Sequence, residues 1–112
     1  MKIGVLSPPV VASESFRKSR ERFIPEQPGC YVLATFDGDV LYIGLARNLR
    51  RRVAQHLESP AKTAPTPKGR AVIVHWRFAD NLEQLERTWL AIHEQHEAKL
   101  PILNKMHSPV SV

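Results

Sequence analysis

The chain has 112 residues, a length that suits one small domain. Its 43% hydrophobic content allows a packed core and excludes a chain that is disordered throughout. A formal charge of +5 favours polyanionic partners, and the single cysteine, Cys30, excludes an intramolecular disulfide and fits a reducing compartment. No apolar run approaches the roughly 20 residues that span a bilayer, and the N-terminus makes a poor signal peptide. We therefore expect a soluble, cytoplasmic protein without a membrane partner.

Residues 1–27 predict an N-terminal extension that packs on the domain or leads into it. Residues 1–12 are expected to form a strand or an extended arm, because two consecutive prolines exclude a helix there. Ser13 is a plausible N-cap for a short helix from Glu14 to about Phe23. Its basic side chains indicate either a solvated face or an arm that contacts phosphate, and charge runs are usually solvated.

Two short apolar segments, residues 30–36 and 40–44, meet at Asp37-Gly38, a sequence typical of a two-residue hairpin turn. Such a turn sets the facing pairs of the hairpin, which would be Phe36–Asp39, Leu33–Tyr42 and Tyr31–Gly44. Facing residues share one side of a sheet, and so do alternate residues along a strand. Tyr31 and Tyr42 are therefore expected to project from the same face.

A helix from about Ala46 to Leu57 is predicted next, because apolar residues recur every four positions and form a ridge that packs on the sheet. Three arginines are expected to point away from this ridge and to bind nucleic acid, namely Arg47, Arg50 and Arg51. Arg52 and His56 are also four apart and lie on the rim of the ridge. From that position they are expected to reach the hairpin.

Residues 58–70 predict a loop, since three prolines interrupt regular structure. Its basic side chains, Lys62, Lys68 and Arg70, have two interpretations that the sequence leaves open. The loop tracks a nucleic-acid backbone, or it is a disordered connection that is merely soluble.

A third strand is predicted over residues 71–78, where β-branched and aromatic residues predominate. Asp80 or Asn81 would then cap a last helix, from about Leu82 to Lys99. Glu86 lies beside the apolar stripe of this helix, where a carboxylate needs a partner. Glu86 either forms a salt bridge at the rim of the helix, with Arg52 as the candidate partner, or provides an oxygen ligand of the kind that suits Mg²⁺ or Mn²⁺.

Three residues in each half of the hairpin carry a family resemblance. Gly29-Cys30-Tyr31 followed by Tyr42-Ile43-Gly44 resembles the paired signature of the GIY-YIG nuclease superfamily, with Cys30 where Ile or Val is usual. Cys30 itself is expected to be a small buried hydrophobe rather than a nucleophile. The resemblance covers roughly residues 27–105. It implies an α+β fold, with a three-stranded antiparallel sheet flanked by helices over residues 28–105. Residues 106–112 are expected to form a loose tail, as chain ends commonly do.

The resemblance also implies a set of site residues. The catalytic residues would be Tyr31, Tyr42, Arg52, His56 and Glu86, with Glu86 also binding the metal, and the supporting residues would be Gly29, Gly44 and Asn104. The implied activity is that of a Mg²⁺- or Mn²⁺-dependent endonuclease that hydrolyses DNA, and RNA is left open as a substrate. The implied settings are DNA repair and recombination, and the implied partner is a protein that targets the enzyme. Since no separate DNA-binding domain is present, a structure-directed or weakly sequence-specific enzyme is expected.

Two departures from the superfamily pattern leave alternatives open. Leu45 stands where a lysine or another polar residue is common, so one phosphate contact is missing. The interval from Glu86 to Asn104 is longer than usual, which leaves Glu94 and Glu97 as alternative metal ligands. A nucleic-acid-binding module without useful catalysis is therefore the alternative function, and the general base is left open among Tyr31, Tyr42 and His56.

Overall fold

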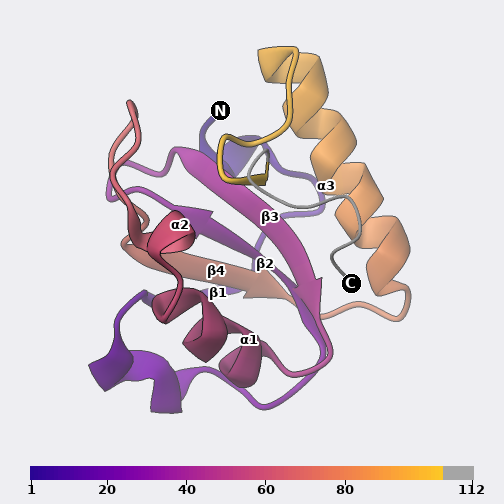
Figure 1. The fold of residues 1–112 in the computed structure, drawn as a ribbon. Helices are drawn as coiled ribbons and strands as arrows, with labels where there is room; N and C mark the ends of the chain where they lie inside the picture. The colour runs from indigo at the N-terminus through magenta and orange to yellow at the C-terminus, as the bar shows by residue number, and fades with distance from the viewer. Residues whose placement is uncertain (105–112) are drawn as a thin grey trace.

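The computed structural model describes residues 1–104, so the predicted tail over residues 106–112 lies outside the described residues. Its centre is one antiparallel sheet with strands in the order β1-β4-β2-β3 (Figure 1). The strands are β1 (Ala12–Ser15), β2 (Gly29–Ala34), β3 (Val40–Ala46) and β4 (Ile73–Arg77). The α+β class is confirmed, and the three predicted strands are present, but the sheet has four strands rather than three.

The extra strand comes from the N-terminal extension, where the predicted helix start is wrong. Ser13 lies in β1 and faces His75 of β4, so it is a strand residue and not an N-cap. The outer edge of β4 would otherwise leave a row of backbone donors and acceptors without partners, and β1 supplies them. A 3₁₀ helix, η2 (Lys18–Phe23), replaces the longer predicted helix, and a second 3₁₀ turn, η1 (Ile3–Val5), lies in the segment predicted to be extended.

The hairpin keeps the predicted register of its tyrosines although its turn differs from the prediction. Thr35 N donates to Asp39 O and Gly38 N donates to Thr35 O, each at 3.0 Å, so the loop has three residues and Phe36 does not face Asp39. Gly38 ends this loop at a φ of +88°, which favours glycine. An irregularity in the ladder between Leu33 and Ala34 then restores the pairs Leu33–Tyr42 and Tyr31–Gly44, and both predicted pairs are confirmed.

Both predicted long helices are present, but the first begins at Leu49 rather than at Ala46, because β3 continues to Ala46. α1 (Leu49–Leu57) starts after Asn48, whose side chain accepts a hydrogen bond from Arg51 N at 3.0 Å. The loop predicted to lack regular structure contains a short helix, α2 (Pro60–Thr63), and a proline is tolerated in its first turn because the missing N–H has no helical partner there. α3 (Leu82–Glu97) starts after Asn81 and ends at Ala98, which adopts a left-handed conformation.

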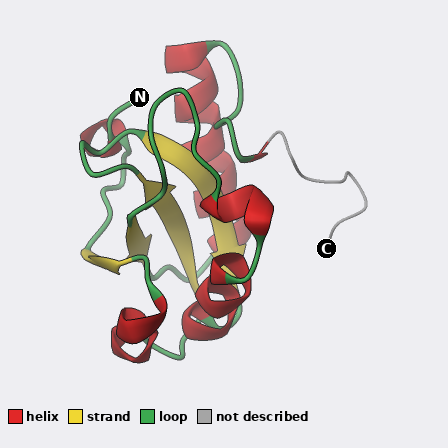
Figure 2. Cartoon of the chain, turned by 60° about the vertical axis from the view of Figure 1, so that its left-hand side comes forward, coloured by secondary structure: helices red, strands yellow, loops and turns green. Residues whose placement is uncertain are grey.

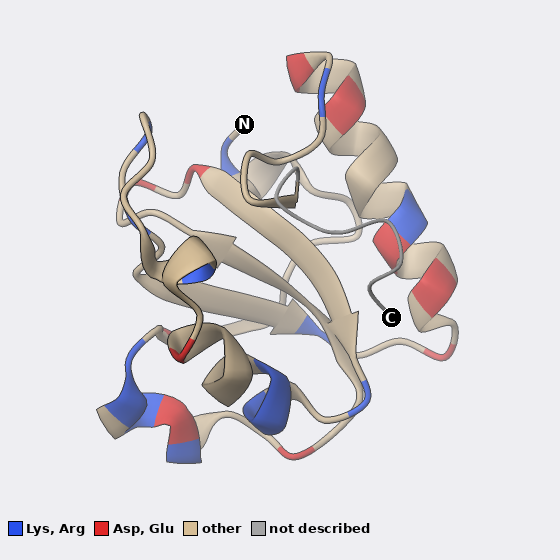
Figure 3. Ribbon diagram, viewed as in Figure 1, with Lys and Arg blue, Asp and Glu red and all other residues tan. Residues whose placement is uncertain are grey.

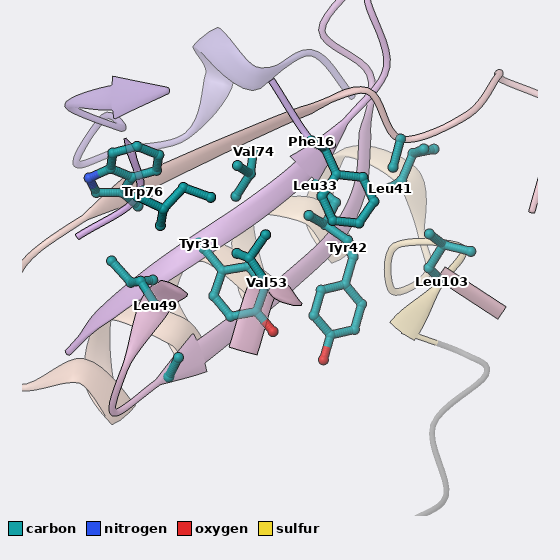
Figure 4. Packing of buried hydrophobic residues seen from close by; sticks show 13 residues of the cluster. Phe16, Tyr31, Leu33, Leu41, Tyr42, Leu49, Val53, Val74, Trp76 and Leu103 are labelled. Atoms are coloured by element: carbon teal, nitrogen blue, oxygen red, sulfur yellow. The ribbon is translucent and has the colours of Figure 1, made fainter. Parts of the chain in front are cut away.

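The helices cover both faces of the sheet (Figures 1 and 2). On one face, Tyr31, Leu33 and Tyr42 pack with Leu49 and Val53 of α1 (Figure 4). The other face packs against α3, through Cys30, Val32, Ile43, Leu85 and Trp89. Cys30 is thus a buried hydrophobe as expected, and burial raises the pKa of its thiol to about 12. Within residues 1–104, no helix is both long and apolar enough to cross a bilayer.

Candidate active site

Three aromatic side chains form a buried cluster on the face of the sheet that α1 covers. The ring centroids of Tyr31 and Tyr42 lie 5.8 Å apart, and the imidazole of His56 lies 5.6 Å from the first and 5.1 Å from the second. Tyr31 Oη is 2.5 Å from His56 Nε2, a hydrogen bond between groups that are almost wholly buried. The α1 ridge that docks on the sheet therefore brings His56 to the hairpin, as its position on the rim predicted.

The two signature glycines make room for this cluster. A Cβ on Gly44 would lie 2.8 Å from Tyr31 Oη and 2.8 Å from Tyr42 Cε1, so both tyrosine rings cover the glycine backbone. A Cβ on Gly29 would lie 2.8 Å from Leu49 Cδ1, where α1 docks. Both glycines are therefore required by close approach of side chains rather than by an unusual φ.

A pocket of about 750 Å³ lies along the β3 edge of the sheet, beside the aromatic cluster. Residues of β3, α1, α3 and the segment after α3 line it, so the pocket joins the two faces of the sheet around this edge. Its functional side chains include Tyr42, Arg52, Glu86 and Asn104. Tyr42 thus brings the aromatic cluster to the pocket, while Tyr31 is fully buried behind it. In Figure 4 both tyrosine hydroxyls point out of the apolar cluster in the same direction.

Asn104 closes the outer edge of β3. Its Nδ2 donates to Ile43 O and its Oδ1 accepts from Ile43 N, each at 2.9 Å, and Leu103 N donates to Leu41 O at 2.9 Å. These bonds replace those that a further strand would make. The amide therefore fixes the β3 backbone directly beside Tyr42.

The two phenols are held in surroundings that oppose ionisation. Burial raises the pKa of Tyr31 well above its ordinary value, and the neighbouring Tyr42 adds to this effect. Burial also raises the pKa of Tyr42, while a hydrogen bond from Tyr31 and the charge of Arg52 lower it. Arg52 is thus the cation that favours both phenolates. Because Tyr42 lines the pocket and Tyr31 does not, Tyr42 is the phenol that a ligand in the pocket would meet.

Glu86 supplies the carboxylate of the pocket. Burial raises its pKa, Glu83 adds to the effect, and Arg87 opposes it. Within residues 1–104 its carboxylate forms no ion pair, so the rim salt bridge to Arg52 that the sequence left open is not found. A half-buried carboxylate without a cationic partner in an open pocket fits a hard cation such as Mg²⁺ or Mn²⁺.

The other candidate glutamates lie elsewhere. Glu97 pairs with the amino group of Met1 at 2.9 Å and with Lys68 at 3.4 Å, and neither it nor Glu94 is among the pocket residues. No group of three His, Cys, Asp or Glu side chains within residues 1–104 is placed to hold a metal ion.

The basic residues predicted to contact nucleic acid divide into several environments. Arg47 and Arg51 line the pocket. Arg50 instead holds the end of η2 and the segment after it, through bonds to Arg22 O at 3.0 Å, Ile24 O at 2.9 Å and Glu26 at 3.1 Å. Lys68 is paired with Glu97 as described above, and Arg70 is exposed. Figure 3 shows positive charge on α1, both signs of charge on η2, and several negative segments on α3.

Lys62 is the residue whose position the sequence did not reveal. Its side chain is only 6% exposed, and Nζ lies 5.1 Å from the centroid of the Tyr42 ring. The sequence signal that could have indicated this placement is Pro60, which suits the first turn of the short helix that carries Lys62. A basic loop residue therefore becomes part of the surroundings of Tyr42.

A sheet hairpin that presents paired tyrosines, an arginine on the next helix and a pocket glutamate define a domain of the GIY-YIG superfamily. A family model described as the UvrC-like GIY-YIG domain matches residues 27–97, and the chain belongs to this family. Similar curated relatives include "UvrABC system protein C" of Symbiobacterium thermophilum, with 45% identity over 34% of this chain and 6% of the relative. The protein of the same name in Porphyromonas gingivalis strain W83 is 54% identical over 30% of this chain and 6% of the relative.

A third relative, "UvrABC system protein C" of Syntrophomonas wolfei, is 39% identical over 46% of this chain and 8% of the relative. The chain thus spans less than a tenth of the length of these relatives. The likeness concerns the GIY-YIG domain alone.

Proposed function

We propose that the chain is a metal-dependent endonuclease that hydrolyses DNA phosphodiester bonds with structural or weak sequence preference. The observation that carries the proposal is the pocket at the β3 edge, where Tyr42, Arg52 and Glu86 converge from three different elements. This combination provides a proton acceptor, a cation for the phosphoryl oxygens and an oxygen ligand for a metal ion. The arginines beside it, Arg47 and Arg51, suit the phosphate backbone.

The proposed reaction follows from these placements. Ionised Tyr42 takes one proton from a water molecule, the water oxygen forms a bond to phosphorus, and the phosphorus bond to the leaving sugar oxygen breaks. The leaving oxygen receives a proton from solvent, and Tyr42 returns its proton to solvent. Arg52 neutralises charge on the phosphoryl oxygens and favours the Tyr42 phenolate. A divalent ion on Glu86 would supply Lewis acidity at the phosphate and stabilise the leaving oxygen.

Tyr31 and His56 do not line the pocket, and their proposed role is to act through Tyr42. Their 2.5 Å hydrogen bond fixes the Tyr31 hydroxyl, and burial keeps that phenol protonated. Tyr31 then donates toward Tyr42, which favours the phenolate of Tyr42. His56 thus sets the direction of the Tyr31 proton, a role that needs its ring nitrogen rather than its size.

The biological setting is proposed from the resemblance and the relatives together. The relatives are named as components of a UvrABC system, and the implied role of the superfamily resemblance is DNA repair. The chain would then depend on a partner protein for targeting.

The test is cleavage of supercoiled plasmid, branched DNA and RNA, with Mg²⁺, Mn²⁺ or EDTA. Glu86→Gln is compared with Glu94→Gln, a matched control on the same helix whose side chain is exposed and lies outside the pocket. We expect nicking that needs the metal, falls at least about a hundred-fold in Glu86→Gln, and is retained in Glu94→Gln.

A second candidate function, a nucleic-acid-binding module without catalysis, is favoured by the apolar Leu45 in the pocket wall. Binding by the wild-type protein without nicking of any substrate, in either metal, would establish that alternative and refute the nuclease. The salt dependence of binding does not discriminate, because both functions involve phosphate contacts.

A further inference from the structure

Lys62 is a lysine that the fold buries without giving it an anionic partner. Within residues 1–104 its ammonium forms no ion pair and no side-chain hydrogen bond, although the residue as a whole is only 6% exposed. Nζ instead lies over the face of the Tyr42 ring, 5.1 Å from the ring centroid. The ammonium at the end of this side chain keeps contact with solvent, since among residues 1–104 the one fully buried side-chain nitrogen or oxygen without a partner is His75 Nε2.

The position of this lysine is built by the fold rather than by a flexible loop. α2 places Lys62 in a helical turn, where Lys62 N donates to Ser59 O at 3.1 Å, and Thr63 Oγ1 bonds the same carbonyl at 3.0 Å. α2 contacts α1, the helix that carries Arg52 and His56. The ammonium is therefore held on one face of the Tyr42 ring by the same framework that positions the proposed catalytic groups.

We propose that Lys62 is a positioning residue of this site, a cation held over the ring of Tyr42 that favours the ionised form of that tyrosine. A cation over an aromatic face is attracted by the ring, and more strongly when both are desolvated. Ionisation of the phenol adds a negative charge to the ring, so the attraction increases when Tyr42 loses its proton. The part of this inference that concerns turnover rests on the proposed nuclease function.

Charged and titratable groups face Tyr42 from every element that surrounds it. They are Tyr31 from β2, Arg52 and His56 from α1, Lys62 from α2, and Glu86 from α3. Burial raises the pKa of Tyr42 and Glu86 raises it further, so the phenolate needs cations nearby. Arg52 provides one of them. Lys62 provides a second, and burial lowers the pKa of Lys62 itself because the folded chain gives it no counter-charge.

The test measures the ionisation of Tyr42 without DNA. The chain has two tyrosines, so Tyr31→Phe leaves Tyr42 as the single one. Incorporating a fluorotyrosine, whose phenol is more acidic than that of tyrosine, brings the titration below the pH of alkaline unfolding, and ¹⁹F NMR follows it in EDTA. We expect Lys62→Met to raise the pKa of the Tyr42 phenol by about one unit, and Lys62→Arg to restore most of the shift.

Lys68→Met is the matched control, since Lys68 lies in the same loop but is paired with Glu97. It should leave the titration of Tyr42 unchanged. Equal titration curves for the wild-type lysine and Lys62→Met, in proteins with the same circular dichroism, would overturn the proposal. A shift that Lys62→Arg does not reduce would also overturn it, because the effect would then come from packing and not from charge.

Turnover provides the second readout, in the chain that retains Tyr31. If the protein nicks DNA, Lys62→Met should lower kcat about ten-fold, with KM within two-fold, and Lys62→Arg should recover activity. An increase in KM with kcat unchanged would contradict a role through Tyr42. If the wild-type protein cleaves no nucleic acid, the nuclease proposal fails, and the titration still decides the role of Lys62.

Discussion

Helix α3 carries two partly exposed carboxylates in opposite electrostatic surroundings. Glu86 lies at the pocket, without an ion pair within residues 1–104, and burial raises its pKa. Glu97, at the end of the helix, bonds the amino group of Met1 and pairs with Lys68, and these cations lower its pKa to about 2.

The lysines of the loop after α1 differ in the same way. Lys62 is buried against Tyr42 without an anion, whereas Lys68 is paired with Glu97. Charges at the end of α3 are therefore neutralised within the fold, whereas Glu86 and Lys62 have no ion-pair partner among residues 1–104. Unpaired, partly desolvated charge at one pocket is typical of a functional site, where binding and not folding supplies the counter-charge.

The largest expected effect follows from changing Gly44, which tests whether the β3 edge depends on close packing of its tyrosines. Gly44→Ala places a methyl group 2.8 Å from Tyr31 Oη and from Tyr42 Cε1, so both rings must move. We expect a loss of about 3 kcal/mol in the free energy of unfolding, measured by urea denaturation. Gly4→Ala is the control, since no atom lies within 4 Å of its added Cβ. A small effect of Gly44→Ala, similar to that of the control, would show that the cluster repacks easily.

Asn104→Ala should have the next largest effect, because it removes both bonds to Ile43 at the open edge of β3. We expect a loss of about 2 kcal/mol in the free energy of unfolding. Gln55→Ala, an exposed residue of the pocket wall, serves as the control and should change stability little. Faster hydrogen exchange at the Ile43 amide in Asn104→Ala would locate the change, and unaltered exchange there would contradict the edge-closing role.

Glu86→Gln should stabilise the protein at neutral pH although it is expected to lower cleavage at least about a hundred-fold. Burial raises the pKa of Glu86 above 4.5, so the folded state disfavours the carboxylate that the unfolded chain accepts. The gain in the thermal unfolding midpoint should be full above the folded pKa and should vanish below pH 4.5, where both states carry the neutral acid. A loss of stability at neutral pH would mean that Glu86 is partnered within the fold.

Glu97→Gln should give the smallest change, with the opposite sign. The pKa of Glu97 is lowered from 4.5 to about 2, so its carboxylate contributes stability above pH 4.5 that is lost as the pH falls toward 2. The unfolding midpoint of Glu97→Gln should therefore be lower than wild type at neutral pH and equal to it near pH 2. Added salt should reduce the difference, because these ion pairs are partly exposed. Equal midpoints at neutral pH and low salt would remove the contrast between the two carboxylates.

The local pattern of the sequence determined much of the sheet and helices. Alternation along the hairpin placed Tyr31 and Tyr42 on one face, and the four-residue spacing in α1 carried His56 to that face. These features depend on neighbours in the chain and on fixed strand and helix periods. The turn prediction was wrong by one residue, and the ladder irregularity between Leu33 and Ala34 compensated for it. Such an irregularity is set by how the hairpin packs, because the turn motif alone permits several loop lengths.

The sequence alone thus determined the family, the tyrosine pair and the candidate glutamate, since each lies in a local motif. Only the tertiary structure decided which of these groups meet. β1 became a strand because the edge of β4 needed partners, although its own residues suggested the start of a helix. Lys62 and Lys68 are chemically identical and six positions apart in one loop, yet one lies over Tyr42 and the other pairs with Glu97. Burial and the presence of a counter-charge are properties of the assembled fold. These two properties, and not the residue type, distinguish the charged groups near the pocket from those in structural ion pairs.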